Sequence, residues 1–197
     1  MVSILLNLFL FLATGIVVMT YFRKDGAWNQ QNGLRSFRFF TTLSNVLVAL
    51  AGLAVFLCEI SGAAPDALPL GIWIFKYLGT TAVAVTLLTV VFFLGPTMGY
   101  KEMFAGSGLY VHLIGPLLAI FSFRFLETKE MYSFATSLLG MIPMTLYGIV
   151  YLIMVVFLPE EKGWDDFYGF NRGGKWMISF AAMLIGTFLI CVILRIL

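Results

Sequence analysis

The sequence predicts an all-α fold: a polytopic integral membrane protein that forms a bundle of six transmembrane helices. Of its 197 residues, 61% are hydrophobic and 11% are charged. The mean hydropathy of +0.99 lies well above the average for globular domains. This composition excludes a soluble domain with a single core. The formal net charge of +2 comes without a basic block, so we expect no nucleic-acid partner.

Charged residues divide the chain into uncharged stretches that are long enough to cross a bilayer. There are six of them: 1–22, 39–58, 77–100, 103–123, 131–159 and 176–194. About 20 helical residues cross the ~30 Å hydrocarbon core, where backbone polar groups must find partners within the protein. We therefore predict one transmembrane domain over residues 1–197. Its predicted spans are about 2–22, 39–58, 73–97, 105–123, 131–158 and 176–195.

Basic residues are distributed unevenly between the predicted linkers. Eight lie in the first, third and fifth linkers: Arg23, Lys24, Arg35, Arg38, Lys101, Lys162, Arg172 and Lys175. The other side holds four: Lys76, Arg124, Lys129 and Arg195. Because basic residues favour cytoplasmic loops, we expect the odd-numbered linkers in the cytoplasm and both termini outside. Lys76 and Arg195 stand at span ends, where we expect them to snorkel to the headgroups.

The residues that usually hold metals or form disulfides are few. Cys58 and Cys191 fall in separate apolar runs, so we interpret them as membrane-buried thiols that are not paired in a disulfide. One histidine, His112, together with two cysteines on separate spans does not make a zinc ligand set. We therefore expect no metal and no cofactor.

His112 is the most informative polar side chain inside a predicted span, because burying such groups without partners is costly. It is also the side chain that titrates near neutrality without any shift of its pKa. One interpretation is a packed histidine in an interhelical hydrogen bond. The other is a general base that activates a nucleophile.

The hydroxyl groups that a base at His112 could activate lie in the run Phe39–Asn45 (FFTTLSN), which opens the second span. The second and fourth spans both begin at an odd linker, so Thr41 or Thr42 and the imidazole can meet near one membrane face. The alternative is common in membrane helices, where threonine hydroxyls bond back to the preceding turn.

Further polar residues near this face have two interpretations each. Asn45 can donate to an oxyanion or pair with another helix. Asp165 and Asp166, in the fifth linker, can orient the imidazole as the third member of a triad, or belong to an ordinary solvated linker. Arg35 and Arg38 can hold an anionic lipid group, or anchor the chain at the cytoplasmic face.

Four segments together resemble the androgen-induced-gene-1 family, which includes ADTRP. They are Phe39–Asn45, His112–Pro116 (HLIGP), Pro143–Tyr151 (PMTLYGIVY) and the aromatic linker before the last helix. The likeness covers most of the chain and is that of a bacterial-type member, which implies the bacterial cytoplasmic membrane. It also implies a six-helix membrane hydrolase that acts on esters of fatty acids with hydroxy fatty acids.

The resemblance implies Thr41 as the nucleophile and His112 as the base. Thr42 stays open as an alternative nucleophile, because the family's Thr-x-x-Asn spacing fits Thr42 and Asn45 while the preceding aromatic pair fits Thr41. The animal relatives keep both termini in the cytosol, which is opposite to the orientation that the charge count predicts here.

The resulting prediction is an intramembrane lipid-ester hydrolase whose partners are membrane lipids. Two other classes stay open: a non-enzymatic bundle that binds lipids or a protein partner, and a small transporter. A transporter would need a polar cavity near the midplane of the membrane. The hydrolase needs a threonine hydroxyl and the imidazole close to a cavity that lipids can enter.

Overall fold

The computed structural model describes residues 1–128, 131–159 and 161–197, so Lys129 of the charge count lies outside it. The first half of the described chain consists of α1 (Val2–Tyr21), β1 (Arg23–Lys24), β2 (Ala27–Trp28), α2 (Gln30–Ser36), α3 (Phe40–Ile60), η1 (Pro65–Ala67), α4 (Leu70–Thr89) and η2 (Val90–Leu94). The second half consists of α5 (Gly95–Met98), α6 (Tyr100–Met103), η3 (Tyr110–Ile114), α7 (Gly115–Phe121), η4 (Ser122–Leu126), α8 (Phe134–Leu138), η5 (Leu139–Met141), α9 (Ile142–Leu152), η6 (Ile153–Phe157), η7 (Arg172–Gly174) and α10 (Trp176–Ile196).

Consecutive elements join into five helices that are long and apolar enough to cross a membrane, within the part of the chain that is described. They are Val2–Tyr21, Phe40–Ile60, Leu70–Met98, Phe134–Phe157 and Trp176–Ile196. The fourth predicted span, 105–123, is a shorter apolar helix, Tyr110–Leu126. At 1.5 Å per residue it extends about 25 Å, less than the ~30 Å of a hydrocarbon core. The all-α membrane bundle is thus observed with five long helices.

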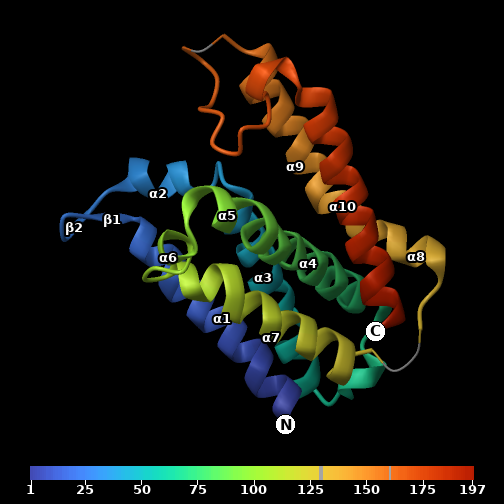
Figure 1. Ribbon diagram of the computed structural model, residues 1–197. Helices are drawn as coiled ribbons and strands as arrows, with labels where there is room; N and C mark the ends of the chain where they lie inside the picture. Colours follow the sequence, from blue (N-terminus) through green and yellow to red (C-terminus); the bar gives the residue numbers. More distant parts are fainter. Residues whose placement is uncertain (129–130, 160) are drawn as a thin grey trace.

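The helices form two groups (Figure 1). Helix α1 packs on α3, α3 packs on α4, and α4 packs on α7 and α10. Helices α9 and α10 lie beside each other and meet the remaining helices chiefly through α4. Both termini lie at one end of the bundle, while α2, α6 and the loop that leads into α10 lie toward the other end (Figure 1).

Two wide helical turns, η2 and η3, each stand before a Gly-Pro pair. Proline has no N–H, and its ring collides with the carbonyl four residues earlier, so the helix widens at that point. In η3 the Gly115 N–H accordingly donates to the Tyr110 carbonyl, five residues back. The carbonyl that Pro116 leaves without its usual helical donor is that of His112. The sequence therefore places this histidine in a distorted turn.

Lys76 and Arg195 differ in their surroundings, although both were expected to snorkel. The expectation for Lys76 is wrong, because its side chain is fully buried and contacts Glu127. A lysine at a helix end stays in the protein when a distant helix supplies a counter-charge. Arg195 donates from Nε to the Tyr132 carbonyl at 2.8 Å. Both cysteines are free thiols.

Gly79 fixes how closely α3 and α4 approach. A Cβ added there would lie 2.7 Å from the Val48 Cα, a contact that only a backbone shift relieves. We expect Gly79→Ala to lower the free energy of unfolding by about 1–3 kcal/mol, measured by thermal or denaturant unfolding in detergent. Gly71→Ala, in the same helix but with open space around its Cβ, should be neutral or slightly stabilising. Equal stabilities of the two variants would contradict this packing.

Candidate functional site

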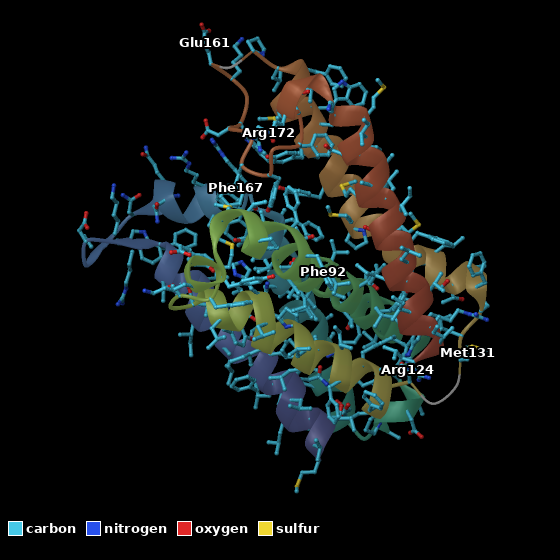
Figure 2. The ribbon with its side chains drawn as sticks, viewed as in Figure 1. Phe92, Arg124, Met131, Glu161, Phe167 and Arg172 are labelled. Atoms are coloured by element: carbon cyan, nitrogen blue, oxygen red, sulfur yellow. The ribbon has the colours of Figure 1, made fainter. Side chains whose placement is uncertain are left out.

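A largely apolar cleft of about 600 Å³ lies among α4, α9 and α10 and reaches the start of α3. Side chains of α4 and η2 form one wall, and side chains of α9 and α10 form the other. Phe92, which lines the cleft, is 74% exposed, so the cleft reaches the lipid-facing surface of the bundle. Figure 2 shows Phe92 between α4 and the α9–α10 pair. The volume lies within the range of small-molecule sites.

One group of polar side chains in the cleft lies where α3 begins, and we call this part the polar end; Thr86, Thr89, Ser179 and Thr187 line the cleft from α4 and α10. Thr41 lines the polar end, together with the tyrosines Tyr147, Tyr151 and Tyr168. The Tyr147 hydroxyl donates to the Arg38 carbonyl at 2.8 Å, which fixes α9 against the entry into α3. The cleft thus combines a largely apolar lining with threonine and tyrosine groups at the start of α3.

Tyr168 closes the polar end from the loop between α9 and α10. Phe39, at the N-cap of α3, has no side chain that can accept a backbone N–H. The Tyr168 hydroxyl takes this role, because it accepts from the Phe40 N–H at 3.2 Å and also interacts with the Thr41 side chain. Removal from water raises the pKa of Tyr168 above its usual value. The phenol therefore stays neutral beside Thr41.

Asn45 joins the turn that carries Thr41 to the turn that carries His112. Its Nδ2 donates to the Thr41 carbonyl at 2.8 Å and to the Val111 carbonyl at 3.0 Å. The Val111 carbonyl accepts this bond because the wide turn η3 diverts the Gly115 N–H to Tyr110. Of the two interpretations of Asn45, the observed contacts correspond to the helix-pairing one. The main chains next to Thr41 and His112 are thereby held side by side.

His112 itself makes a hydrogen bond within its own segment. Its Nδ1 lies 2.6 Å from the Met103 carbonyl. A carbonyl only accepts, so Nδ1 carries a proton, and Nε2 of the neutral ring is unprotonated. His112 is half-buried and is not among the residues that line the cleft. Among the hydrogen bonds of the described chain, none joins it to Thr41 or Thr42.

Thr42 differs from Thr41 in its position. Its side chain is 5% exposed, and the residue does not line the cleft. Thr41 is half-buried and does line it. The two adjacent threonines thus point to different surroundings, and Thr41 is the one that a ligand in the cleft would meet.

Asp165 and Asp166 contact groups other than His112. Asp165 forms an exposed ion pair with Arg35, with 3.1 Å between Oδ2 and the guanidinium nitrogen. Asp166 organises its own loop, because its carboxylate accepts the N–H groups of Phe170 and Asn171 at 2.7 and 2.8 Å. The observed geometry gives neither aspartate the role of orienting the imidazole.

Arg35 and Arg38 line a smaller hollow of about 230 Å³ that adjoins the cleft. Tyr151 lines both cavities and therefore stands between them. The Arg38 guanidinium lies 5.8 Å from the centre of the Trp164 ring, within the range of a cation–π contact. Phe167, labelled in Figure 2, belongs to the loop segment that lines the same hollow. Asp165 and Asp166 line the same hollow, so two carboxylates balance its two cations.

Sequence reasoning missed the tyrosines of this site. Tyr147 and Tyr151 stand four residues apart, which looks like an ordinary packing stripe. Tyr168 lies in a linker, where an aromatic residue usually indicates the membrane interface. Comparison of the chain with family models, with curated proteins and with solved structures gave no match.

Proposed function

We propose that this protein is a membrane-embedded hydrolase of lipid esters, with Thr41 as the nucleophile and His112 as the base. The observation that carries the proposal is the position of Thr41 at the polar end of an apolar cleft that opens toward lipid. An acyl chain in the cleft would bring its ester carbonyl to the end where Thr41 and Tyr168 lie. The resemblance to the androgen-induced-gene-1 family supports the same assignment and suggests esters of fatty acids with hydroxy fatty acids as substrates.

The chemistry is an acyl transfer in two steps. The imidazole Nε2 accepts the proton of the Thr41 hydroxyl, and the alkoxide attacks the ester carbonyl. The leaving alcohol takes the proton from the imidazolium, which leaves an acyl-threonine. Water then attacks this ester, with the imidazole again as the base, and the free acid and the hydroxyl of Thr41 are restored.

His112 fits the role of the base through its hydrogen bond to Met103. A fixed acceptor at Nδ1 keeps the proton on that nitrogen and leaves the lone pair on Nε2 free, as the aspartate of a catalytic triad does. Asn45 holds the two helical turns together. Contacts between nucleophile and base often tighten only when the substrate is bound. Arg35 and Arg38 would hold an anionic group of the lipid beside the cleft, and at Arg35 this group would replace Asp165.

A substitution that places a larger side chain in the cleft tests the function. Gly186 lines the cleft, and a Cβ added there meets nothing within 4 Å, so a larger side chain enters the cavity without a backbone clash. We expect Gly186→Leu to lower kcat/KM for long-chain lipid esters about tenfold or more, because the leucine side chain occupies the volume that the acyl chain would fill. The measurement is turnover of a panel of lipid esters by purified protein in detergent.

The matched control is Gly15→Leu. Gly15 lies on α1, away from the cleft, and its added Cβ also meets nothing within 4 Å. Turnover by this variant should equal that of the unmodified chain. The proposal fails if the unmodified chain hydrolyses none of the esters, or if both leucine variants lose activity equally.

A second candidate is an acyl-lipid carrier without catalysis. The hydrogen bond of His112 to Met103 favours it, since that contact alone satisfies a packed histidine. The carrier would bind a fluorescent fatty acid in the cleft, and Gly186→Leu would abolish this binding. The carrier would release no acid from any ester. Ester turnover therefore separates the two functions.

We also propose the bacterial cytoplasmic membrane, with Tyr110–Leu126 as a sixth span and the odd linkers in the cytoplasm. In support, α2, α6 and the loop before α10 lie toward one end of the bundle, and the termini lie at the other (Figure 1). Eight of the twelve basic residues belong to the segments at the first end. The polar end of the cleft would then face the cytoplasm.

A further inference from the structure

Three charged side chains are buried together at the end of the bundle that is opposite to Thr41. Lys76 is 0% exposed, Glu127 is 1% exposed and Glu59 is 6% exposed. Glu59 stands at the end of α3, and Thr41 at its beginning. At 1.5 Å per residue the two lie about 27 Å apart along the helix axis. The cluster is therefore separate from the proposed hydrolase site.

Glu127 has the contacts of an ionised carboxylate. Its Oε1 lies 3.5 Å from the Lys76 ammonium and accepts from the Asn7 Nδ2 at 2.7 Å. The Ser122 hydroxyl donates to the same oxygen. Lys76 in turn donates to the Asn7 Oδ1. A buried carboxylate that has a counter-ion and several donors is the favourable case for burying a charge.

Glu59 has much poorer contacts for a negative charge. Its Oε2 is buried without a hydrogen-bond partner, and the same holds for the Oε2 of Glu127. The two carboxyl groups therefore differ at Oε1. Glu127 Oε1 contacts the Lys76 ammonium, Asn7 and Ser122, whereas Glu59 Oε1 has the Ser3 hydroxyl at 2.5 Å. Glu59 has no ion pair within 4 Å among the described residues. An ionised Glu59 would have a single hydroxyl donor and no cation in contact, which is costly inside a membrane protein.

The Ser3 hydroxyl limits how the two carboxyl groups can share protons. Its oxygen lies 2.5 Å from Glu59 Oε1 and 3.4 Å from Glu127 Oε1. A hydroxyl has one proton and can donate to only one of two carboxylates. If Glu59 carries a proton, it donates to Ser3, and Ser3 donates to Glu127. The unpartnered oxygen of Glu59 is then a neutral carbonyl, which costs much less to bury.

The charge count leads to the same protonation state. Lys76 and two carboxylates sum to −1, and one added proton makes the cluster neutral. The polar groups around Glu59 come from three other parts of the chain. Ser3 and Asn7 belong to α1, Lys76 belongs to α4, and Ser122 and Glu127 belong to η4 and its C-cap. The Met1 amino group attracts Glu59 at longer range, but Met1 is 89% exposed and water screens its charge.

We propose that Glu59, Ser3, Glu127 and Lys76 form a binding site for one exchangeable proton, which Glu59 holds at neutral pH. The site binds and releases this proton at the membrane face where α1 begins and α3 ends. It is independent of the ester chemistry, because none of its residues lines the cleft.

Infrared spectroscopy tests the site directly. In a detergent without ester groups, the unmodified chain at neutral pH should give a protonated-carboxyl band that shifts in D₂O and accounts for one carboxyl group per chain. Glu59→Gln should remove the band. Glu127→Gln should remove it too, since Glu59 then ionises as the sole counter-ion of Lys76. Lys76→Met should increase the band toward two carboxyl groups, because both carboxylates lose their cation.

Glu161→Gln is the control, since Glu161 is exposed in the loop before α10 and should leave the band unchanged. Circular dichroism reports whether each variant keeps its helices. If a glutamine variant unfolds, ¹³C labelling of glutamate in the unmodified chain replaces it, and the band must shift with the label. The proposal is overturned if the unmodified chain has no such band, if Glu59→Gln keeps it, or if the glutamate label leaves it in place.

Discussion

Thr41→Ala is expected to abolish covalent labelling by a fluorophosphonate-type probe, and Thr42→Ala is expected to keep it. The two threonines are adjacent and chemically identical, so they serve as each other's control. Thr41 lines the cleft beside Tyr168, whereas Thr42 is buried and does not line it. A probe that enters the cleft therefore meets one hydroxyl. Labelling is measured on purified protein by gel fluorescence, and the modified residue is located by mass spectrometry.

The opposite pattern would assign the nucleophile to Thr42 and would require a rearranged start of α3. Labelling that persists in both single variants would reject a threonine nucleophile altogether. Thr41→Ser offers a further check, because it keeps the hydroxyl and should keep labelling. These outcomes concern the hydrolase alone, so they do not depend on the proton site at the far end of the bundle.

His112→Ala is expected to lower kcat/KM for the best lipid ester by about 10²–10⁴-fold, the usual contribution of a general base. The imidazole is held by the Met103 carbonyl through Nδ1, which leaves Nε2 to take the proton of the nucleophile. Loss of the ring removes this acceptor. The measurement is steady-state hydrolysis in detergent, with the helix content of the variant as the control for folding.

His112→Gln separates catalysis from structure. A glutamine amide can still donate to the Met103 carbonyl, but it cannot accept a proton at neutral pH. If His112 is the base, the glutamine variant is as inactive as the alanine variant. If His112 only ties its turn to Met103, glutamine restores turnover, and the proposed role of the imidazole is wrong.

The membrane class and the positions of the long helices could be predicted from the sequence, because charges are expensive in hydrocarbon and so they mark helix ends. The first, second and last predicted spans agree with α1, α3 and α10 to within a few residues. The predicted bounds of the fourth span were less accurate. Hydropathy counts apolar residues, but it does not reveal that residues 104–107 form a turn and that the helix begins only after them.

The residues of the candidate site were partly predictable. Thr41 and His112 stand out as polar groups in apolar runs, yet their partners are distant in sequence. Tyr168 approaches Phe40 across 128 residues, and no local pattern shows this contact. Pro116 did carry a local signal, since a proline four residues after His112 predicts a disturbed helical turn.

The burial of Lys76 bears on how the protein is made. Its partners Asn7 and Glu127 come from the first and fourth helices and are 120 residues apart. A ribosome delivers Lys76 to the membrane well before Glu127 has been synthesised. Until then Glu59 is the one carboxylate of the cluster that can balance the ammonium group, so the first three helices lack the ion pair that they have in the folded protein. Their final arrangement has to wait for the arrival of the fourth.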